Sequence, residues 1–414
     1  MSALRDPRFR RLLAGSSLSS FGDSALYLTL GIWAKSLTGS NAAAGSVFLA
    51  LGIPALFAPL TGQLADRMPR RRLLIITNAA TGLLVLSLLA VHSRDQLWII
   101  YLVAFGYGLS FGLIGSASAG LRKDLLADDD LGGANAALQT INQGLRIVSP
   151  LAGAALFAAL GGGAVAVLDT ATFAAAIIAL ASIRLTETPP EVRGQVSYLR
   201  DLTAGFRHLR SVPLLAQITL MCACAFSVIG LNETIIFAVI DQGLHRPPSF
   251  FGITSSVQGA GSIAAGLTVA WLLKRLGTAR MIGLGLAVFA LAAAAYRTHS
   301  LVLVLAAAVG DGIALIWLVV ALTTAAQRYT PPQLQGRVTA AWTMLILTPQ
   351  TISIAAGAAL IAFVDYRTML LVITAVLSAC ALLLLIRPAA EPAPAKAAPD
   401  ATALDEVAAV AGPR

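Results

Sequence analysis

The feature that most constrains this chain is the return of apolar runs of about 20 residues along almost its whole length. A run of that length crosses a bilayer as a helix. Only 12% of the residues are charged, against about 25% in a soluble domain, so the chain lacks the polar residues of a soluble surface. Lipid excludes open sheets and irregular backbone, because their polar groups would have no partners. We therefore expect an all-α membrane protein.

Twelve runs qualify, and the longest polar break divides them six and six. We expect spans at 14–36, 43–64, 73–91, 97–121, 134–158, 163–184, 214–238, 249–273, 280–297, 300–324, 338–363 and 366–387. The expected domains are an N-terminal six-helix half (1–184), a cytoplasmic linker (185–212), a C-terminal six-helix half (213–387) and a disordered cytoplasmic tail (388–414). Within the linker, apolar residues at helical spacing predict an amphipathic helix on the membrane surface from Tyr198 to Arg210.

The two halves show traces of an internal repeat. A shift of about 206 residues lays Pro7 on Pro213 and brings 66–72 near 274–280. Each match is short, but their nearly common offset indicates two duplicated, pseudo-symmetric bundles. Such a duplication is typical of secondary transporters.

The basic residues predict the orientation. With both termini inside, 23 of the 29 Lys and Arg residues fall on the inner side and five on the outer side, with Arg146 inside a span. The positive-inside rule then places both termini in the cytoplasm. The excess of Arg over Lys and the many alanines favour a bacterial cytoplasmic membrane. Because the basic residues are spread over separate loops, the net charge of +9 does not indicate a nucleic-acid partner.

No pattern for a metal, a nucleotide or an enzyme is present in the sequence. The three cysteines lie inside apolar runs without metal-ligand spacing, and the four histidines are scattered among loops: Cys222, Cys224, Cys380, His92, His208, His245 and His299. No glycine-rich phosphate loop with a lysine appears, which disfavours transport driven by ATP. We expect no cofactor, with the proton gradient as the energy source. A membrane-embedded enzyme is the alternative least favoured by these residues.

The polar loop between the second and third spans carries a motif. Its residues are Gly62, Leu64, Ala65, Asp66, Arg67, Arg70, Arg71 and Arg72. The pattern and its position resemble the signature loop of the major facilitator superfamily. The resemblance implies twelve helices in two halves, with Asp66 facing the N-terminus of the eleventh span and Arg70 meeting Asp124. The loop would then be a latch that switches between conformations; the alternative is a simple positive-inside anchor.

The fifth span carries a second motif. Gly144, Pro150 and Gly153 are similar to the antiporter motif of drug–proton exporters, with Ser149 in place of its first glycine. Small residues permit close helix approach, and a proline permits a local bend. The alternative is ordinary packing.

Further segments resemble the macrolide and drug exporter branch of the superfamily, which siderophore exporters share. They are 21–23, 168–173 and 335–338. One departure concerns the fourth span, which has no arginine between 104 and 111 where many proton antiporters have one. Arg146 is the candidate replacement.

Ionisable residues inside the spans are candidates for proton coupling. A charge near the bilayer centre costs about 3 kcal/mol, so it is rare and usually functional. We rank Asp23 first, then Glu233 and Asp311, with Arg146 as the counter-charge to one of them. Asp169 ranks lower, because its place in the span suggests that it lies nearer water. The alternative for each acid is a structural ion pair or hydrogen bond.

The resemblance also implies a substrate cavity lined by the first, fourth, seventh and tenth spans. Apolar and aromatic residues with a few polar anchors suit such a cavity. The candidates are Tyr27, Trp33, Tyr107, Phe111, Phe226, Asn232 and Trp317; lipid-facing or packing roles are the alternative.

Together these features favour a monomeric secondary transporter whose partners are a small molecule, protons and the bilayer. Proton-coupled efflux of hydrophobic drugs by alternating access is the first hypothesis. Export of a native metabolite such as a siderophore, or import of a solute, is the alternative. The substrate, the direction and the coupling ion stay open at this point.

Overall fold

The computed structural model describes residues 5–57, 61, 64, 67–126, 128–183, 198–331 and 334–392, and every element in these ranges is helical. The longer helices are α1 (Pro7–Thr38), α2 (Asn41–Gly52), α4 (Arg70–Leu86), α5 (Leu97–Leu125), α6 (Asp128–Leu160), α7 (Gly162–Ala181), α8 (Tyr198–Ser211), α9 (Pro213–Ile229), α10 (Asn232–Ala238), α11 (Phe250–Ala295), α12 (Leu301–Tyr329), α13 (Gln335–Leu360) and α14 (Tyr366–Ile386). Short turns lie at η2 (Ile53–Phe57), η3 (Ser87–Ala90), η4 (Arg94–Gln96) and η5 (Val239–Gly243).

Ten helical segments in the described ranges are long and apolar enough to cross a membrane. They coincide with the third to the twelfth predicted spans. The first predicted span falls within α1, which is 32 residues long but contains Asp23 and several serines. The second begins in α2 and η2 and continues past Phe57, where the described range breaks. The chain is thus an all-helical multi-pass membrane protein, and the full count of twelve stays a prediction.

Local sequence signals explain where these helices begin and end. Asp6 caps α1 by accepting a 2.7 Å hydrogen bond from the backbone N–H of Arg8, and Pro7 occupies the first turn. Gly39 ends α1 in the left-handed conformation, at φ 69°. Gly277 (φ 75°, ψ 173°) interrupts α11, so that this one long helix contains two predicted spans.

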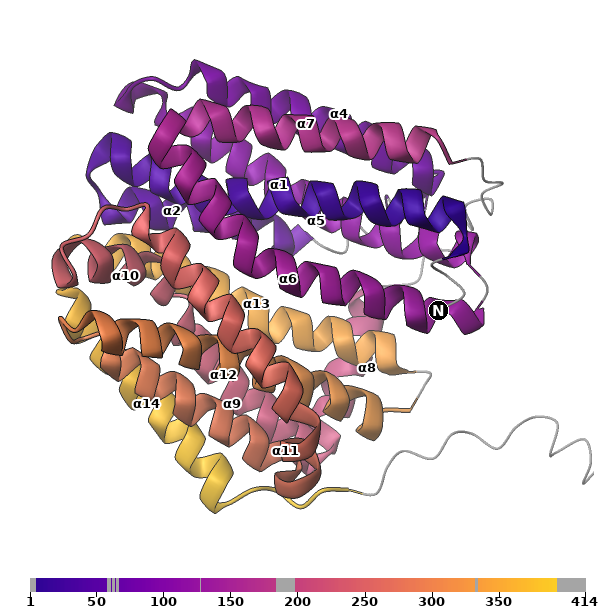
Figure 1. Ribbon diagram of the computed structural model, residues 1–414. Helices are drawn as coiled ribbons and strands as arrows, with labels where there is room; N and C mark the ends of the chain where they lie inside the picture. The colour runs from indigo at the N-terminus through magenta and orange to yellow at the C-terminus, as the bar shows by residue number, and fades with distance from the viewer. Residues whose placement is uncertain are drawn as a thin grey trace, which may run out of the picture.

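The helices gather by chain half (Figure 1). The indigo to magenta helices α1, α2, α4, α5 and α7 lie together, and the pink to yellow helices α9 to α14 form the other group. Two long contacts join the groups: α6 packs along α11, and α2 packs along α13. A shift of 206 residues, the predicted repeat, carries α2 onto the start of α11 and α6 onto α13, so the two contacts are equivalent.

The polar break holds the predicted helix, α8, which packs against α13 and α9. Leu209 is buried there and Phe206 partly buried, so at least this part of the apolar face contacts protein. Residues 184–197 lie outside the described residues, and the surface location of the helix stays a prediction.

The first residues of the predicted tail, 388–392, contact the bundle, whereas 393–414 lie outside the described residues and their disorder stays a prediction. The side chain of Gln217 bonds the carbonyl of Arg387 and the N–H of Ala389, both at 2.7 Å. Glu391 accepts 2.6 Å and 3.0 Å hydrogen bonds from the N–H of Thr278 and the hydroxyl of Tyr329. A carboxylate is favourable where a helix starts, and Thr278 starts the second part of α11.

Candidate functional site

Two acids of the first half meet at one tyrosine. The Tyr107 hydroxyl on α5 lies 2.5 Å from Asp23 Oδ1 on α1 and 3.1 Å from Asp169 Oδ2 on α7. Asp169 and Tyr107 are almost fully buried. Thr172 adds a 3.3 Å contact from its hydroxyl to Asp169 Oδ1. We refer to Asp23, Tyr107 and Asp169 as the acid cluster.

The Tyr107 hydroxyl has one hydrogen for the two carboxylate oxygens that it contacts, Asp23 Oδ1 and Asp169 Oδ2. A phenol has one O–H to donate, and an ionised carboxylate only accepts. Tyr107 can donate its hydrogen to only one of the two acids. The contact with the other acid is favourable only when that acid is protonated and donates its own hydrogen to the Tyr107 oxygen. The geometry of the acid cluster thus suits a site that gains and loses one proton.

Close packing of α1 on α7 creates this cluster. A Cβ at Gly22 would collide with the side chains of Thr172 and Asp169, so the absence of a side chain lets the two helices approach. This corrects the sequence-based placement of Asp169 nearer water. The prediction used only the position of Asp169 along its span, which does not show that α1 and α5 pack over its side chain.

The second half holds another pair of an acid and a tyrosine. Tyr296 donates a 2.7 Å hydrogen bond to Asp311 Oδ2, and Asp311 is 2% exposed. Asp311 Oδ1 has no hydrogen-bond partner among the described residues. A cavity of about 70 Å³ lies beside it, and Glu233 and Asn232 are on the wall of that cavity. Asp311 and Glu233, predicted separately, therefore share one small polar cavity.

A larger cavity of about 670 Å³ lies between the halves, which we call the central cavity. Asp23 is on its α1 wall, and Glu233 is on the opposite side, on α10. Tyr27, Phe111 and Phe251 add aromatic surface. Other lining residues contribute amides and small polar groups: Ser20, Ser24, Gln139, Asn142, Ser255 and Gln258. Apolar walls with a few polar anchors are what a small-molecule site needs.

The other predicted cavity residues have packing positions. Trp33 is 6% exposed and lies edge-on to Phe157, and Phe226 is buried in the core. Trp317 donates a 3.2 Å hydrogen bond to Thr268, which joins α12 to α11. None of the three is among the residues that line the described cavities. Whether such a residue lines the cavity depends on which face of its helix it occupies, and not only on which span it belongs to.

The α6 helix supplies polar cavity-lining and interhelical residues that the sequence did not single out. Gln139 and Asn142 line the central cavity, and Ile147 accepts a 2.6 Å hydrogen bond from Ser256 of α11. Gln139 and Asn142 could have been found in the sequence, because they are polar residues inside an apolar span. The side chain of Arg146 lies outside the described residues, so its partnership with an acid stays a prediction.

The residues of the antiporter-like motif differ in how closely they pack against neighbouring helices. A Cβ at Gly153 would lie 2.7 Å from the carbonyl oxygen of Ala25, so α6 and α1 are in backbone contact there. Pro150 lies inside α6 on the wall of the central cavity, and its carbonyl is in close contact with Gly252 of α11. A Cβ at Gly144 would meet nothing within 4 Å.

The arginine loop makes the predicted ion pair. Arg70 Nη1 lies 2.6 Å from Asp124 Oδ2, whose side chain is only 7% exposed. Arg71 donates to the carbonyls of Leu180 and Ala181, both at 2.7 Å, and so caps the end of α7. Arg67 and Arg72 are exposed. Gly62 and Asp66 lie outside the described residues, so the contact of Asp66 and the role of the loop as a latch stay predictions.

An ion pair joins the two halves at the opposite end of the bundle. Lys35 Nζ lies 2.7 Å from Asp241 Oδ2, so the end of α1 is joined to η5 of the second half. Beneath it, Phe48, Phe237 and Phe251 pack with ring centroids 4.9–6.2 Å apart. We call this end the Lys35 end, and the end with Arg70, Arg71 and Arg122 the arginine-rich end.

Within the described residues, no group of His, Cys, Asp and Glu is arranged to hold a metal, and the three cysteines are free thiols.

Comparison with known proteins decides the family. The profile of the Major Facilitator Superfamily matches residues 12–245 and again 223–411, which is nearly the whole chain. The chain belongs to the major facilitator superfamily. It is a transporter, and the alternative of a membrane-embedded enzyme is set aside, because the curated relatives are transporters too.

The curated relatives are distant members of the superfamily. The uncharacterized MFS-type transporter YfiS of Bacillus subtilis is 24% identical over 61% of each chain. Macrolide efflux protein A of Streptococcus pyogenes is 23% identical over 63% of this chain and 65% of its own. The enterobactin exporter EntS of Shigella flexneri is 27% identical over 52% and 53%. The match thus spans less than two thirds of each of these relatives.

Solved structures of the superfamily share the fold. The nucleoside transporter NupG superimposes with a TM-score of 0.73 at 16% identity, covering 92% of this chain and 98% of NupG. A bacterial homologue of the iron transporter ferroportin, in an inward-facing state, gives 0.67 at 16% identity, with 91% and 98% covered. At such identities the likeness shows the fold alone.

Proposed function

We propose that this transporter exports hydrophobic small molecules in exchange for protons, with Asp23 as the proton-carrying group that faces the cargo. The observation that carries the proposal is the position of Asp23. It lies on the wall of the central cavity and at the same time contacts Tyr107, which reaches Asp169. Macrolide efflux protein A, a relative with a drug-efflux name, supports the choice of cargo class.

The position of Asp23 explains how exchange is coupled. A carboxylate on the cavity wall attracts a cationic cargo, and its neutral, protonated form attracts that cargo less because the negative charge is gone. Proton binding at Asp23 therefore releases cargo, and loss of the proton restores the site. Glu233 faces the same cavity from the second half and provides a second proton-binding group.

The orientation follows from the arginine-rich end. We place that end and both termini in the cytoplasm of a bacterium, in accord with the positive-inside rule. The Lys35 end then faces outward, where the ion pair and the phenylalanine cluster separate the central cavity from the outside. In this proposal the transporter is a monomer that uses the proton gradient, and the central cavity opens inward when the Lys35 end is closed.

The experiment is expression in a pump-deficient bacterium with a panel of drugs and an efflux dye. We expect resistance to some drugs and dye efflux that a protonophore abolishes. Asp23→Asn should abolish efflux, and Asp95→Asn, in an exposed loop, should not. Efflux that continues in the presence of the protonophore would contradict proton coupling, and net uptake would favour the importer alternative.

The second candidate function is export of a native metabolite such as a siderophore. The amides of Gln139, Asn142 and Gln258 on the cavity wall favour it, because an oxygen-rich cargo can bond to them. The exporter EntS among the relatives points the same way. Comparison of metabolites secreted by a deletion strain and its parent distinguishes the two. A missing secreted metabolite with an unchanged drug profile would favour this candidate.

A further inference from the structure

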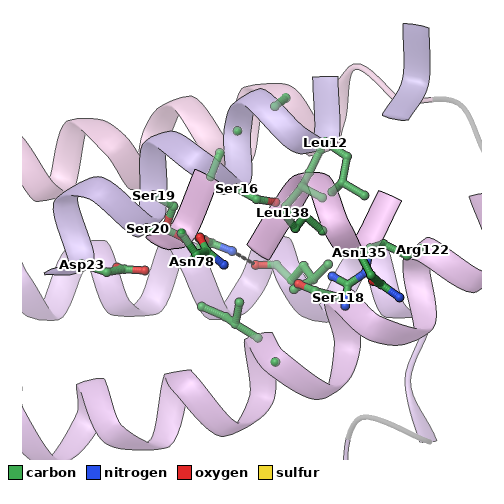
Figure 2. A pocket seen from close by; sticks show the side chains of 18 of the residues that line it. Leu12, Ser16, Ser19, Ser20, Asp23, Asn78, Ser118, Arg122, Asn135 and Leu138 are labelled. Atoms are coloured by element: carbon green, nitrogen blue, oxygen red, sulfur yellow. Dashed lines mark hydrogen bonds between the residues drawn. The ribbon is translucent and has the colours of Figure 1, made fainter. Parts of the chain in front are cut away.

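A second large cavity lies wholly within the first half. Its volume is about 410 Å³, and its walls come from α1, α4, α5, α6 and α7. Figure 2 shows Asp23 at one end of the labelled lining residues and Arg122 with Asn135 at the other. Arg122 and Asn135 lie near the arginine-rich end. The cavity therefore leads from that end of the bundle to the acid cluster.

The lining of this cavity mixes polar side chains with apolar ones such as Leu12, Leu74 and Ile114. Hydroxyl and amide side chains follow its length: Ser16, Ser19, Ser20, Asn78, Ser118 and Gln139. Such groups are costly inside a membrane unless they bond to protein or face water. They come from four helices and turn toward one space, which indicates that the space holds water. Its volume has room for on the order of ten water molecules.

Asp23 lies at the junction of two cavities. It borders this cavity and also the central cavity, and Ser20, Gln139 and Asn142 are shared by both walls. The central cavity is where cargo has room to bind. The other cavity reaches Asp23 from within the first half, since all of its lining residues belong to α1, α4, α5, α6 and α7.

We propose that this cavity is a water-filled passage that carries protons between the cytoplasm and Asp23 without crossing the cargo site. The step is a proton transfer: an O–H bond of Asp23 breaks, an O–H bond of a hydronium ion forms, and no electrons are exchanged. Cargo in the central cavity then does not block release of the proton. The role in coupling rests on the proposed function, whereas the presence of the water does not.

Gly115 provides a place to block the passage without disturbing the fold. It lines the cavity on α5, and a Cβ there would meet nothing within 4 Å. Gly115→Leu places an apolar side chain in the water path. Gly266→Leu on α11 is the matched control, because that glycine is exposed, equally open and not among the lining residues. Ser118→Leu is a second block one turn along α5.

The first measurement tests the water itself. In a background with Cys222, Cys224 and Cys380 replaced by serine, Ser19→Cys reports access to a small charged thiol reagent added at the cytoplasmic side. We expect labelling, slowed about tenfold by Gly115→Leu and unchanged by Gly266→Leu. Absence of labelling, or the same rate with both blocks in place and the protein folded by its melting temperature, would overturn the passage.

The second measurement tests its role in coupling. In proteoliposomes, Gly115→Leu should slow cargo-driven proton flux about tenfold while the affinity for cargo stays unchanged. Unchanged flux with labelling blocked would overturn the role and leave the proposed function standing. No proton flux from the unmodified protein would instead contradict the proposed function, with the labelling result unaffected.

Discussion

Lys35 and Asp241 form an ion pair across the two halves although they occupy equivalent positions in them. Their side chains meet at 2.7 Å, and they are 206 residues apart, the offset of the internal repeat. The pair therefore lies where the first helices of both halves converge. Duplication would have produced two identical residues here, which would repel if charged. The present pair of opposite charges attracts.

Loss of this pair should open the Lys35 end of the bundle, which we propose faces outward. The Lys35 side chain is 7% exposed and that of Asp241 49%, so breaking the pair costs about 1–2 kcal/mol, between the values for exposed and buried pairs. Lys35→Met should raise labelling of Ser255→Cys from outside severalfold. The exchange Lys35→Asp with Asp241→Lys should restore the low rate. Arg94→Met, an exposed outer charge, serves as the control, and equal labelling in all variants would refute the closure role.

The two glycines of the antiporter-like motif should respond differently to alanine. Gly153 lies against the backbone of Ala25, so Gly153→Ala should destabilise the protein by about 1–3 kcal/mol. Gly144 faces open space, so Gly144→Ala should leave stability unchanged or raise it by up to about 1 kcal/mol. Thermal unfolding in detergent measures both. Similar melting temperatures for the two variants would contradict the close contact of α6 with α1.

Arg70 and Arg72 carry the same charge on one helical turn, but only Arg70 should matter for stability. Removing Arg70 leaves the nearly buried carboxylate of Asp124 without its 2.6 Å ion pair, at a cost of about 1–3 kcal/mol. Arg72 is exposed, so Arg72→Ala should change stability by less than about 0.5 kcal/mol. Equal effects would support the simple positive-inside anchor instead.

Glu391 should stabilise the tail contact at neutral pH and lose it in acid. Partial burial acts to raise its pKa, but the hydrogen bonds from Thr278 and Tyr329 and the nearby Arg328 outweigh this, so the pKa lies below the ordinary 4.5. A carboxyl with a lowered pKa stabilises the folded state above pH 4.5 and loses that effect as the pH falls through its lowered value.

Glu391→Gln tests this contact. The variant should be less stable by about 0.3–1 kcal/mol at neutral pH, as expected for a charge at a helix start. The difference in melting temperature from the unmodified protein should vanish in acid. A difference in melting temperature that grows as the pH falls would contradict a lowered pKa of Glu391. The contact has a further interest, because the loop at 274–280 lacks the acid of its first-half counterpart and Glu391 supplies one from the tail.

The spans could be predicted because hydrocarbon requires long apolar runs, and that requirement is visible in one dimension. The pair of Arg70 with Asp124 was also predictable, since the superfamily resemblance brought the ends of neighbouring spans together. The acid cluster could be predicted only in part. Asp23 and Tyr107 were each candidates, but their contact depends on how far α1 and α5 are rotated about their axes.

Residues far apart in the chain account for what the sequence did not reveal. Lys35 was counted as an outer positive charge, although it is buried against Asp241 of the other half. Asp169 was placed nearer water, because its position along α7 says nothing about the approach of α1 at Gly22. In both cases lateral packing of helices decided the environment, and hydropathy along the chain does not record such packing.

Cargo-driven proton flux in proteoliposomes tests the role of Asp23 most directly. With an identified cargo on one side and a pH dye inside, the unmodified protein should move protons opposite to the cargo, and Asp95→Asn should do the same. Asp23→Asn should still bind cargo but move no protons. Proton flux from Asp23→Asn equal to that of the unmodified protein would contradict the role of Asp23.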